Sequence, residues 1–216
     1  TKKAKAPQLW LTTLFHVGSG LPWDWRVGPA DASERTHFRD MLDSLPEEAT
    51  VAADAGYVGY DLVAAVLASG RGLILRVGGN AKLLRKLGCV RESAGTVYLW
   101  PDKIAKKRLP PLALRLVQAH DGRRSIYVLA SAASPTELSD RRVLELYRRR
   151  WGVELFYRSL KRTFRRRKLR SASPAPALVE MEWSLLGLWT MAFYALDSLL
   201  AHGHDPRRLS CAKLLR

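Results

Sequence analysis

Cysteine is scarce in this chain of 216 residues, which contains two, Cys89 and Cys211. Two cysteines are too few for the disulfide framework of a small secreted domain, and their spacing matches no common zinc site. Both residues therefore indicate structural thiols in a reducing compartment, and we expect a cytoplasmic protein.

The sequence also lacks a recognisable secretory signal and a long hydrophobic run. Lys2, Lys3 and Lys5 are not followed by the apolar stretch of a signal peptide. The longest uncharged stretch, Trp183–Leu196, is shorter than the roughly 20 residues that a membrane span needs, and it predicts a buried helix. We therefore expect no membrane association, and a chain that stays in the cell.

Acidic residues are few, since 20 Asp and Glu stand against 36 Lys and Arg, which gives a formal net charge of +16. Residues 1–54 carry a balance of −2, so the positive excess follows position 54. Residues 141–170 alone contain 13 Lys and Arg and 2 Glu. Such a density indicates a surface that binds a polyanion, although a solvated basic face is the alternative for any charge run considered alone.

The first part of the chain predicts a hairpin, a helix and a β-α-β unit. Leu9–Val17 and Leu21–Val27 are rich in β-branched and aromatic residues and are separated by glycines, as in paired strands. A helix is expected from about Asp31 to Pro46, where apolar residues recur at helical spacing. A strand, a helix and a strand follow at Thr50–Ala53, Tyr60–Ser69 and Gly72–Val77. Asp54 would lie at the carboxyl end of a strand, where open α/β sheets bind their ligands.

Residues 78–135 predict a β-rich segment, and the rest of the chain predicts helices. Strands are expected at Thr96–Trp100, Leu112–Gln118 and Ser125–Ser131. A helical pattern returns at Thr136 and extends to about Arg167. The proline-containing sequence 171–176 interrupts it, and Ala177–Ala201 predicts an apolar final helix.

A ladder of polar residues lies within the predicted helix of residues 136–167. Tyr147, Arg150, Glu154 and Lys161 fall within roughly 60° of arc at about 100° per residue, so one side of the helix presents them together. Their spacing, Y-x2-R-x3-E-x6-K, resembles the YREK signature of bacterial transposases of the insertion sequence 4 type.

The resemblance covers nearly the whole chain and implies a fold. Asp54-Ala-Gly-Tyr-Val-Gly-Tyr resembles the block around the second catalytic aspartate of that family, and Leu73–Val77 with the following Gly-Gly-Asn80 resembles the next strand. The implied fold is α/β and ribonuclease-H-like, a mixed sheet flanked by helices. Residues 1–77 would form the first part of this core, 78–135 a β-rich insertion before the last catalytic helix, and 136–216 the helical last part.

The same resemblance implies metal-dependent chemistry on DNA. In this family a DDE triad of carboxylates holds divalent metal ions, and the matching positions here are Asp54 and Glu154. Metal ions stabilise charge on the attacking and leaving oxygens of a phosphodiester, so Mg²⁺ or Mn²⁺ is the expected cofactor. The implied enzyme is a DDE transposase, which cleaves transposon ends and transfers strands in DNA transposition.

Further positions are implied to bind DNA. In the family, the tyrosine, arginine and lysine of the motif contact phosphates at the transposon end, which implies Tyr147, Arg150 and Lys161 here. Arg158 and Arg165 lie near the same stripe by geometry and are not part of the motif. The implied partner is double-stranded DNA of the terminal repeats and target, bound by a dimer. The resemblance also implies a bacterial protein in the cytoplasm, associated with the nucleoid.

Simpler explanations exist for each of these residues alone. Asp54 could form a turn with the glycine that follows, and Glu154 could be a surface carboxylate that pairs with Arg150 and Arg158. Trp100 could stack on an unpaired base, although a buried core tryptophan is the commoner use. The combination of motif spacing, arginine run and strand order favours the transposase.

One departure from the family pattern concerns activity. The first aspartate of the triad belongs to the first strand of the fold, whereas Leu9–Val17 fits the second strand. Neither Asp24, on the next strand, nor Asp31, at a helix start, suits the missing ligand. The sequence thus predicts the carboxyl-terminal portion of a transposase. It is either a catalytic domain that needs an aspartate from outside this chain, or an inactive remnant that still binds DNA. A basic structural protein without transposon specificity is the third alternative.

Overall fold

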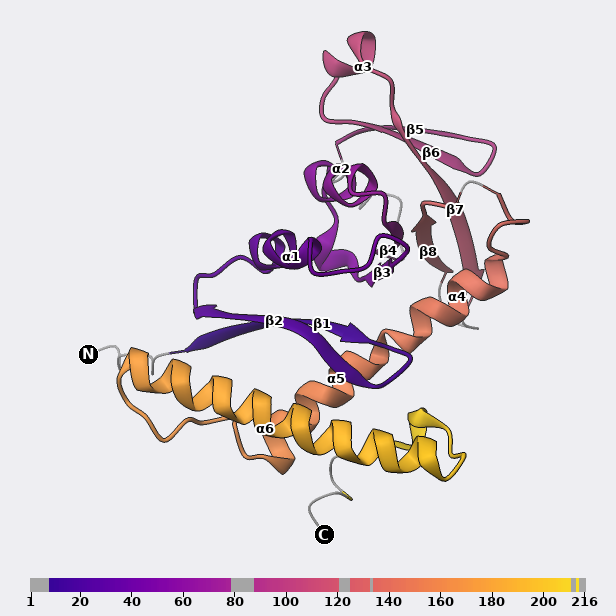
Figure 1. Ribbon diagram of the computed structural model, residues 1–216. Helices are drawn as coiled ribbons and strands as arrows, with labels where there is room; N and C mark the ends of the chain where they lie inside the picture. The colour runs from indigo at the N-terminus through magenta and orange to yellow at the C-terminus, as the bar shows by residue number, and fades with distance from the viewer. Residues whose placement is uncertain (1–7, 79–87, 121–124, 133, 211–212, 214–216) are drawn as a thin grey trace. The chain divides into compact units, whose positions relative to one another are not determined.

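The computed structural model describes residues 8–78, 88–120, 125–132, 134–210 and 213 (Figure 1). The chain divides into two units, which we describe separately. Residues 1–41 and 151–216 form the hairpin unit, and residues 42–150 form the sheet unit. Asn80 and Cys211, which the sequence singles out, lie outside the described residues, as do Lys2, Lys3 and Lys5.

A six-stranded mixed sheet forms the sheet unit, in the order β3-β4-β8-β7-β6-β5 (Figure 1). β3 and β4 are parallel, and the other neighbours are antiparallel. The strands are β3 (Thr50–Ala53), β4 (Gly72–Gly78), β5 (Cys89–Ser93), β6 (Thr96–Trp100), β7 (Leu112–His120) and β8 (Ser125–Ala130). The expected α/β class with a mixed sheet flanked by helices is confirmed.

Two helices pack on this sheet. α2 (Tyr60–Ala68) connects β3 to β4, as the β-α-β pattern predicts, and packs against β4. α4 (Asp140–Arg149) contacts β3 and β7 and buries Val143 against Ile74 and Val128. Because neighbouring residues of a strand point to opposite faces, Leu73 and Leu75 point away from α4. The sheet therefore buries apolar side chains on both faces.

β5 and β6 form a hairpin that the sequence predicts only in part. β6, β7 and β8 are confirmed, whereas β5 is a strand that the pattern did not indicate. The side chain of Trp100 at the end of β6 is buried, and its Nε1–H donates a hydrogen bond to the carbonyl oxygen of Leu109 at 2.9 Å. The core alternative for Trp100 is thus confirmed. The division of the chain at residues 77 and 135 stays a prediction.

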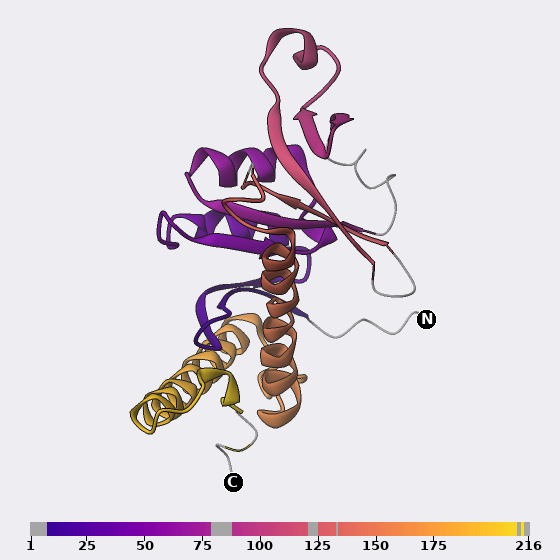
Figure 2. The ribbon, with the colours of Figure 1, turned by 90° about the vertical axis from the view of Figure 1, so that its right-hand side faces the viewer.

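The predicted hairpin is confirmed as β1 (Leu9–His16) and β2 (Leu21–Pro29), which are antiparallel. The expected helix after it is α1 (Glu34–Leu42), and α5 (Trp151–Arg158) and α6 (Pro174–Ala201) complete the hairpin unit (Figures 1 and 2). Its core is a cluster of five buried residues, Phe156, Leu160, Met181, Leu185 and Leu188, against which side chains of the hairpin pack. α5 approaches β1 closely at Gly152, where an added Cβ would lie 2.7 Å from the ring of Phe15.

The predicted single helix of residues 136–167 is wrong in two respects. The α-helical segments are α4 and α5, with Arg150 between them, and a π-helical turn, Ser159–Thr163, follows α5. The helical region ends shortly after Thr163, because the backbone of Arg165 has a φ of +55°. A positive φ is incompatible with continuation of a right-handed helix.

α6 is the predicted final helix, but it is buried on one face only. Leu185, Leu188 and Ala192 are nearly inaccessible to solvent. Trp183 and Tyr194, on the outward face, are 69% and 72% exposed. By length and composition alone α6 is apolar enough to cross a membrane, with 28% of its most apolar window buried. The prediction of a buried helix is therefore wrong for the outward face.

Candidate functional site

Asp54 lies directly after β3, at the start of the short 3-10 helix η1 (Ala55–Tyr57). Its Oδ1 accepts a hydrogen bond from the backbone N–H of Gly56 at 2.9 Å, which confirms the turn-forming alternative. The side chain is nevertheless 47% exposed. A carboxylate held by one oxygen and open to solvent can accept a second partner, so the turn does not exclude a ligand role.

Arg150 follows α4 and brings a positive charge to Asp54. Its Nη1 lies 4.0 Å from Oδ2 of Asp54, and its side chain is 18% exposed. The guanidinium also lies over the ring of Tyr147, with 5.6 Å between the guanidinium carbon and the ring centroid. The sheet unit thus gathers three of the predicted site residues. The sequence indicated each of them but gave no sign that Arg150 contacts Asp54.

The hydroxyl of Tyr147 is buried and has no hydrogen-bond partner among the described residues. The ring packs against the apolar cluster of α4 and the sheet, which includes Ile74. A buried hydroxyl without a partner costs about 1–3 kcal/mol, and such groups in native proteins call for an explanation. A phosphate contact through this hydroxyl requires the side chain to move, and the contact stays a prediction.

Glu154 belongs to the hairpin unit, on α5, and its side chain is half-buried. Asp54 belongs to the sheet unit, so joint metal binding by Asp54 and Glu154 stays a prediction. Across residues 8–78, 88–120, 125–132 and 134–210, no three His, Cys, Asp or Glu side chains gather into a metal-binding group. Carboxylate oxygens are suitable ligands for Mg²⁺, and one or two carboxylates with substrate phosphate can hold it.

The remaining members of the predicted stripe follow Glu154 in the hairpin unit. Arg158 is exposed at the end of α5. Lys161 lies on the π-helical turn, with its Nζ 5.8 Å from the centroid of the Tyr157 ring. Arg165 is exposed beyond the end of the helix. The expectation of one straight α-helical stripe is therefore wrong for Lys161 and Arg165, because the π-helical turn changes the angle per residue and Arg165 is no longer helical.

Tyr157 lies in the last turn of α5, before the π-helical turn. Its hydroxyl donates a hydrogen bond to the carbonyl oxygen of Leu11 at 3.3 Å, which connects α5 to β1. Burial of the side chain raises the pKa of Tyr157, so the hydroxyl stays protonated at neutral pH. The hydrogen bond thus fixes α5, which leads into the turn that carries Lys161, to the hairpin. π-Helical turns are frequent at functional sites.

Part of the basic run has acidic partners within the chain. Glu145 pairs with Arg142 at 2.9 Å and with Arg149 at 2.6 Å, and these hydrogen bonds, first that from Arg142, lower the pKa of Glu145. Arg166 pairs with Glu180 at 3.3 Å. Other basic side chains are solvent-exposed, namely Arg141 and Arg148 in the sheet unit and Arg158, Lys161, Arg162, Arg165, Arg167, Lys168 and Arg170 in the hairpin unit. Both units therefore carry exposed positive charge of this run.

Glu180 organises the loop that follows the basic run, and no local sequence pattern predicts this role. Its carboxylate accepts hydrogen bonds from the backbone N–H groups of Arg170, at 2.9 Å, and Ser171, at 3.0 Å. These bonds, first that from Ser171, hold the pKa of Glu180 below its usual value. The carboxylate thus ties the loop after the arginines to the first turns of α6.

Comparison with known proteins gives two matches. The family model described as the transposase DDE domain matches residues 2–189. The chain is also 26% identical, over 225 residues, to transposase InsG for insertion sequence element IS4 of Escherichia coli strain K12. The match covers 97% of this chain and 50% of that protein, so the chain spans about half the length of the curated relative. No solved structure matches the chain.

Proposed function

The chain belongs to the transposase DDE domain family, and on this premise we propose that it acts in DNA transposition, through metal-dependent cleavage and strand transfer at transposon ends. The observation that supports the proposal best is the contact of Asp54 with Arg150 at the carboxyl end of β3. An exposed carboxylate beside a guanidinium combines a metal ligand with a donor for phosphate.

Each member of this group has a distinct task in the proposal. The backbone N–H of Gly56 orients the Asp54 carboxylate through one oxygen and leaves the other for a partner. Arg150 donates to a DNA phosphate, and its planar fork suits two phosphate oxygens at once. The ring of Tyr147 supports the guanidinium from one side. Arg150 would exchange a weak contact with Asp54 for a stronger one with phosphate when DNA binds.

Mg²⁺ or Mn²⁺ is the cofactor that we propose, and it would stabilise charge on the phosphodiester oxygens that attack and leave. Asp54 and Glu154 are the residues of this chain that would hold it. A third carboxylate completes the family's triad, and we expect neither Asp24 nor Asp31 to take its position. Asp24 forms an ion pair with Arg26 at 2.7 Å. The proposal therefore takes the first aspartate from outside this chain.

The DNA contacts extend along the basic run. Arg150 and Lys161 would bind phosphates of the terminal repeat, and Arg158 and Arg165 would extend the contact along the backbone. All of these carry charge that neutralises phosphate and releases counterions. We propose double-stranded DNA of the transposon end and target as the partner, bound by a dimer in the bacterial cytoplasm.

An inactive remnant that binds DNA without cleaving it is the second candidate. The observation that favours it is that, among the described residues, no three His, Cys, Asp or Glu side chains gather into a group that could hold a metal ion. Both candidates predict DNA binding that weakens with salt, and only the first predicts cleavage. A basic protein without transposon specificity would bind end DNA and unrelated DNA equally.

The deciding experiment is nicking of supercoiled plasmid and of transposon-end DNA by the purified chain with Mg²⁺ or Mn²⁺. Glu154→Gln is the matched control, since it keeps the shape of the side chain and removes its charge. Nicking that disappears in Glu154→Gln supports the active enzyme. Salt-sensitive binding without nicking supports the remnant. If the unmodified chain and Glu154→Gln each bind end DNA and scrambled DNA with equal affinity, the transposon-specific function is contradicted.

A further inference from the structure

Six apolar residues of α6 point to solvent, and we call them the apolar stripe. Their exposed fractions are 55% for Val179, 69% for Trp183, 44% for Leu186, 47% for Phe193, 72% for Tyr194 and 55% for Leu200. At about 100° per residue these side chains fall within roughly 120° of arc. The helix therefore has two apolar faces, and the hairpin unit covers one of them.

The apolar stripe is large enough to form an interface. With side-chain areas of about 150–250 Å² for its three aromatic residues, it exposes roughly 600 Å² per molecule. Two such surfaces bury about 1,200 Å² in total, the lower end of the range for specific protein interfaces. Isolated exposed apolar residues need no explanation, whereas a patch of about 600 Å² is at the upper end of the range for a monomer, and such patches are often functional.

The spacing of the stripe suits another helix. Val179, Leu186, Phe193 and Leu200 follow one another at intervals of seven residues. A seven-residue apolar repeat keeps one side of a helix against a partner helix along its length. The stacked rings of Trp189 and Phe193, 5.2 Å apart, hold Phe193 in place, and Trp189 is fixed by a hydrogen bond to Pro22. The stripe is thus a helix-shaped surface in which stacking fixes one member, Phe193.

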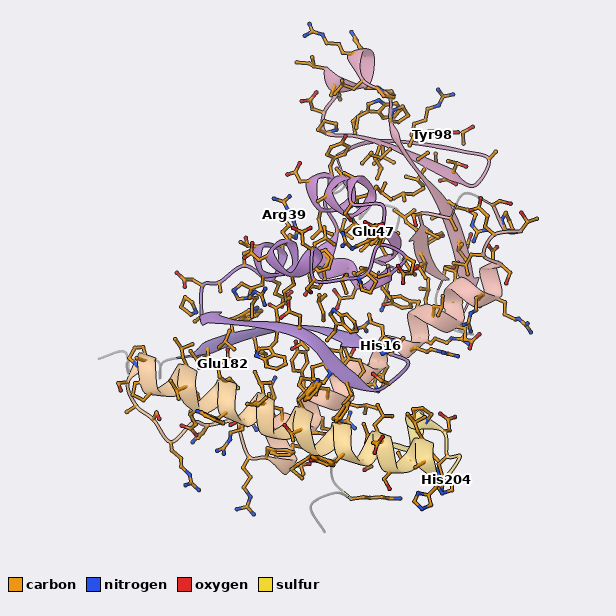
Figure 3. The ribbon with its side chains drawn as sticks, viewed as in Figure 1. His16, Arg39, Glu47, Tyr98, Glu182 and His204 are labelled. Carbon is orange, nitrogen blue, oxygen red and sulfur yellow. The ribbon has the colours of Figure 1, made fainter. Side chains whose placement is uncertain are left out.

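Charge on α6 selects the orientation of such a partner. α6 contains Glu180, Glu182 and Asp197 and no Lys or Arg. Asp197 lies in the middle of the stripe by angle, whereas Glu182, labelled in Figure 3, accepts a hydrogen bond from Trp25 at 2.8 Å. A parallel pair in register would place one Asp197 against another. An antiparallel pair centred on Thr190 keeps them about 21 Å apart along the axis, from 14 residues at 1.5 Å each.

We propose that the apolar stripe binds the same stripe of a second copy of this chain, in an antiparallel pair of α6 helices centred on Thr190. In this arrangement Phe193 of one copy faces Gly187 of the other, and Asp197 faces the indole N–H of Trp183. Nothing lies within 4 Å of the position of an added Cβ at Gly187, so the ring has space. The pairing involves neither DNA nor the acidic residues of the candidate site.

The first test is the mass of the full chain in solution, measured by analytical ultracentrifugation without DNA at several concentrations and high salt. The chain is expected to dimerise with rising concentration, and Leu186→Arg is expected to remain monomeric. Leu109→Arg is the matched control, because Leu109 is 54% exposed and lies outside α6. A monomer at all concentrations, or a dimer that Leu186→Arg leaves intact, overturns the proposal.

The second test is disulfide cross-linking in a chain whose Cys89 and Cys211 are replaced by Ser. Thr190→Cys should give a covalent dimer on oxidation, since the two copies of residue 190 meet at the centre. Asp197→Cys should not, although it lies on the same stripe. Efficient cross-linking through Asp197→Cys, or none through Thr190→Cys, contradicts the antiparallel pair.

A membrane surface is the alternative occupant of an apolar helix face. Flotation with vesicles of phosphatidylcholine and phosphatidylglycerol distinguishes it. Vesicle binding that Leu186→Arg abolishes, by a chain that stays monomeric, would replace the proposal. DNA nicking is measured separately. Dimerisation can therefore fail while the transposase function holds, and nicking can fail while the chain dimerises.

Discussion

A carboxylate can cap a turn and serve as a ligand at once, and Asp54 has the geometry for both. One oxygen accepts the N–H of Gly56, and the other lies 4.0 Å from Arg150. The sequence placed Asp54 correctly after a strand, because apolar runs and the following glycine are local signals. It could not reveal the contact with Arg150, which depends on how α4 packs on the sheet.

Asp54→Asn separates the two tasks. The amide oxygen can still accept the Gly56 N–H, so we expect the free energy of unfolding to change by less than about 0.5 kcal/mol. Asp54→Ala removes the cap and should cost about 1 kcal/mol. Urea denaturation of both variants checks the stabilities, and the plasmid assay checks cleavage. Retained metal-dependent nicking in Asp54→Asn would exclude Asp54 as a metal ligand.

Tyr147→Phe removes a buried hydroxyl that has no partner among the described residues. We expect this variant to unfold at a higher urea concentration, with a gain of about 1 kcal/mol, because the desolvation cost of the hydroxyl disappears. Tyr147→Ala should lose about 3 kcal/mol through the cavity that it leaves. If Tyr147→Phe is instead destabilised, the hydroxyl has a partner in the folded protein. A loss of end-DNA affinity in Tyr147→Phe would show that the hydroxyl binds phosphate.

At the scale of elements, most helices and strands could be predicted, and the departures have physical causes. Hydrophobic periodicity identified the hairpin, the β-α-β unit and α6. It could not resolve the π-helical turn of Ser159–Thr163, because one wider turn hardly alters the pattern of apolar residues. The end of that helix was also missed, since Arg165 adopts a positive φ without the glycine that usually signals it.

The turn between β5 and β6 offers a test of element stability. Ala94 and Gly95 have φ angles of 51° and 76°, the left-handed geometry of a two-residue hairpin loop. Asn is favoured over Ala at the first position of such a loop. Ala94→Asn should therefore raise the free energy of unfolding by about 0.5–1 kcal/mol, measured by urea denaturation. Ala94→Val should lower it, and equal stability of the two variants would contradict the turn geometry.

At the scale of the whole molecule, charge is distributed unevenly, and α6 has acidic but no basic residues in a chain of net charge +16. The sequence predicted an uneven distribution of charge and a polyanion as partner. Composition could not predict which arginines have internal partners. Arg142, Arg149 and Arg166 are paired with carboxylates, so fewer charges are available to DNA than the sequence count suggests.

The salt dependence of DNA binding tests this distribution. Arg150→Ala and Lys161→Ala should each weaken binding to end DNA and reduce the slope of log affinity against log salt by about 1. Glu154→Gln should leave the slope unchanged. Fluorescence anisotropy across a salt series measures it, with the exposed Arg91→Ala on β5 as the matched control. Equal defects in Arg150, Lys161, Glu154 and Arg91 variants would contradict the proposed DNA surface.

The candidate site could be predicted as a set of residues but not as an arrangement. The spacing of the motif selected the residues, because metal and phosphate binding need particular side chains at particular intervals along a helix. The division of these residues between two units depends on contacts between segments that are far apart in the chain. A local sequence pattern carries no information about such contacts. The same limit applies to α6, whose composition indicated burial although its outward face is open to solvent.

β3 is a four-residue strand at one end of the six-stranded sheet, and within the described part of the chain it pairs with β4 alone. Its other edge presents backbone groups immediately before Asp54. A short extended peptide could occupy that edge by ladder hydrogen bonds. Such a peptide would block the strand beside the proposed catalytic carboxylate without resembling DNA, the highly charged polymer that we propose as the ligand of this chain.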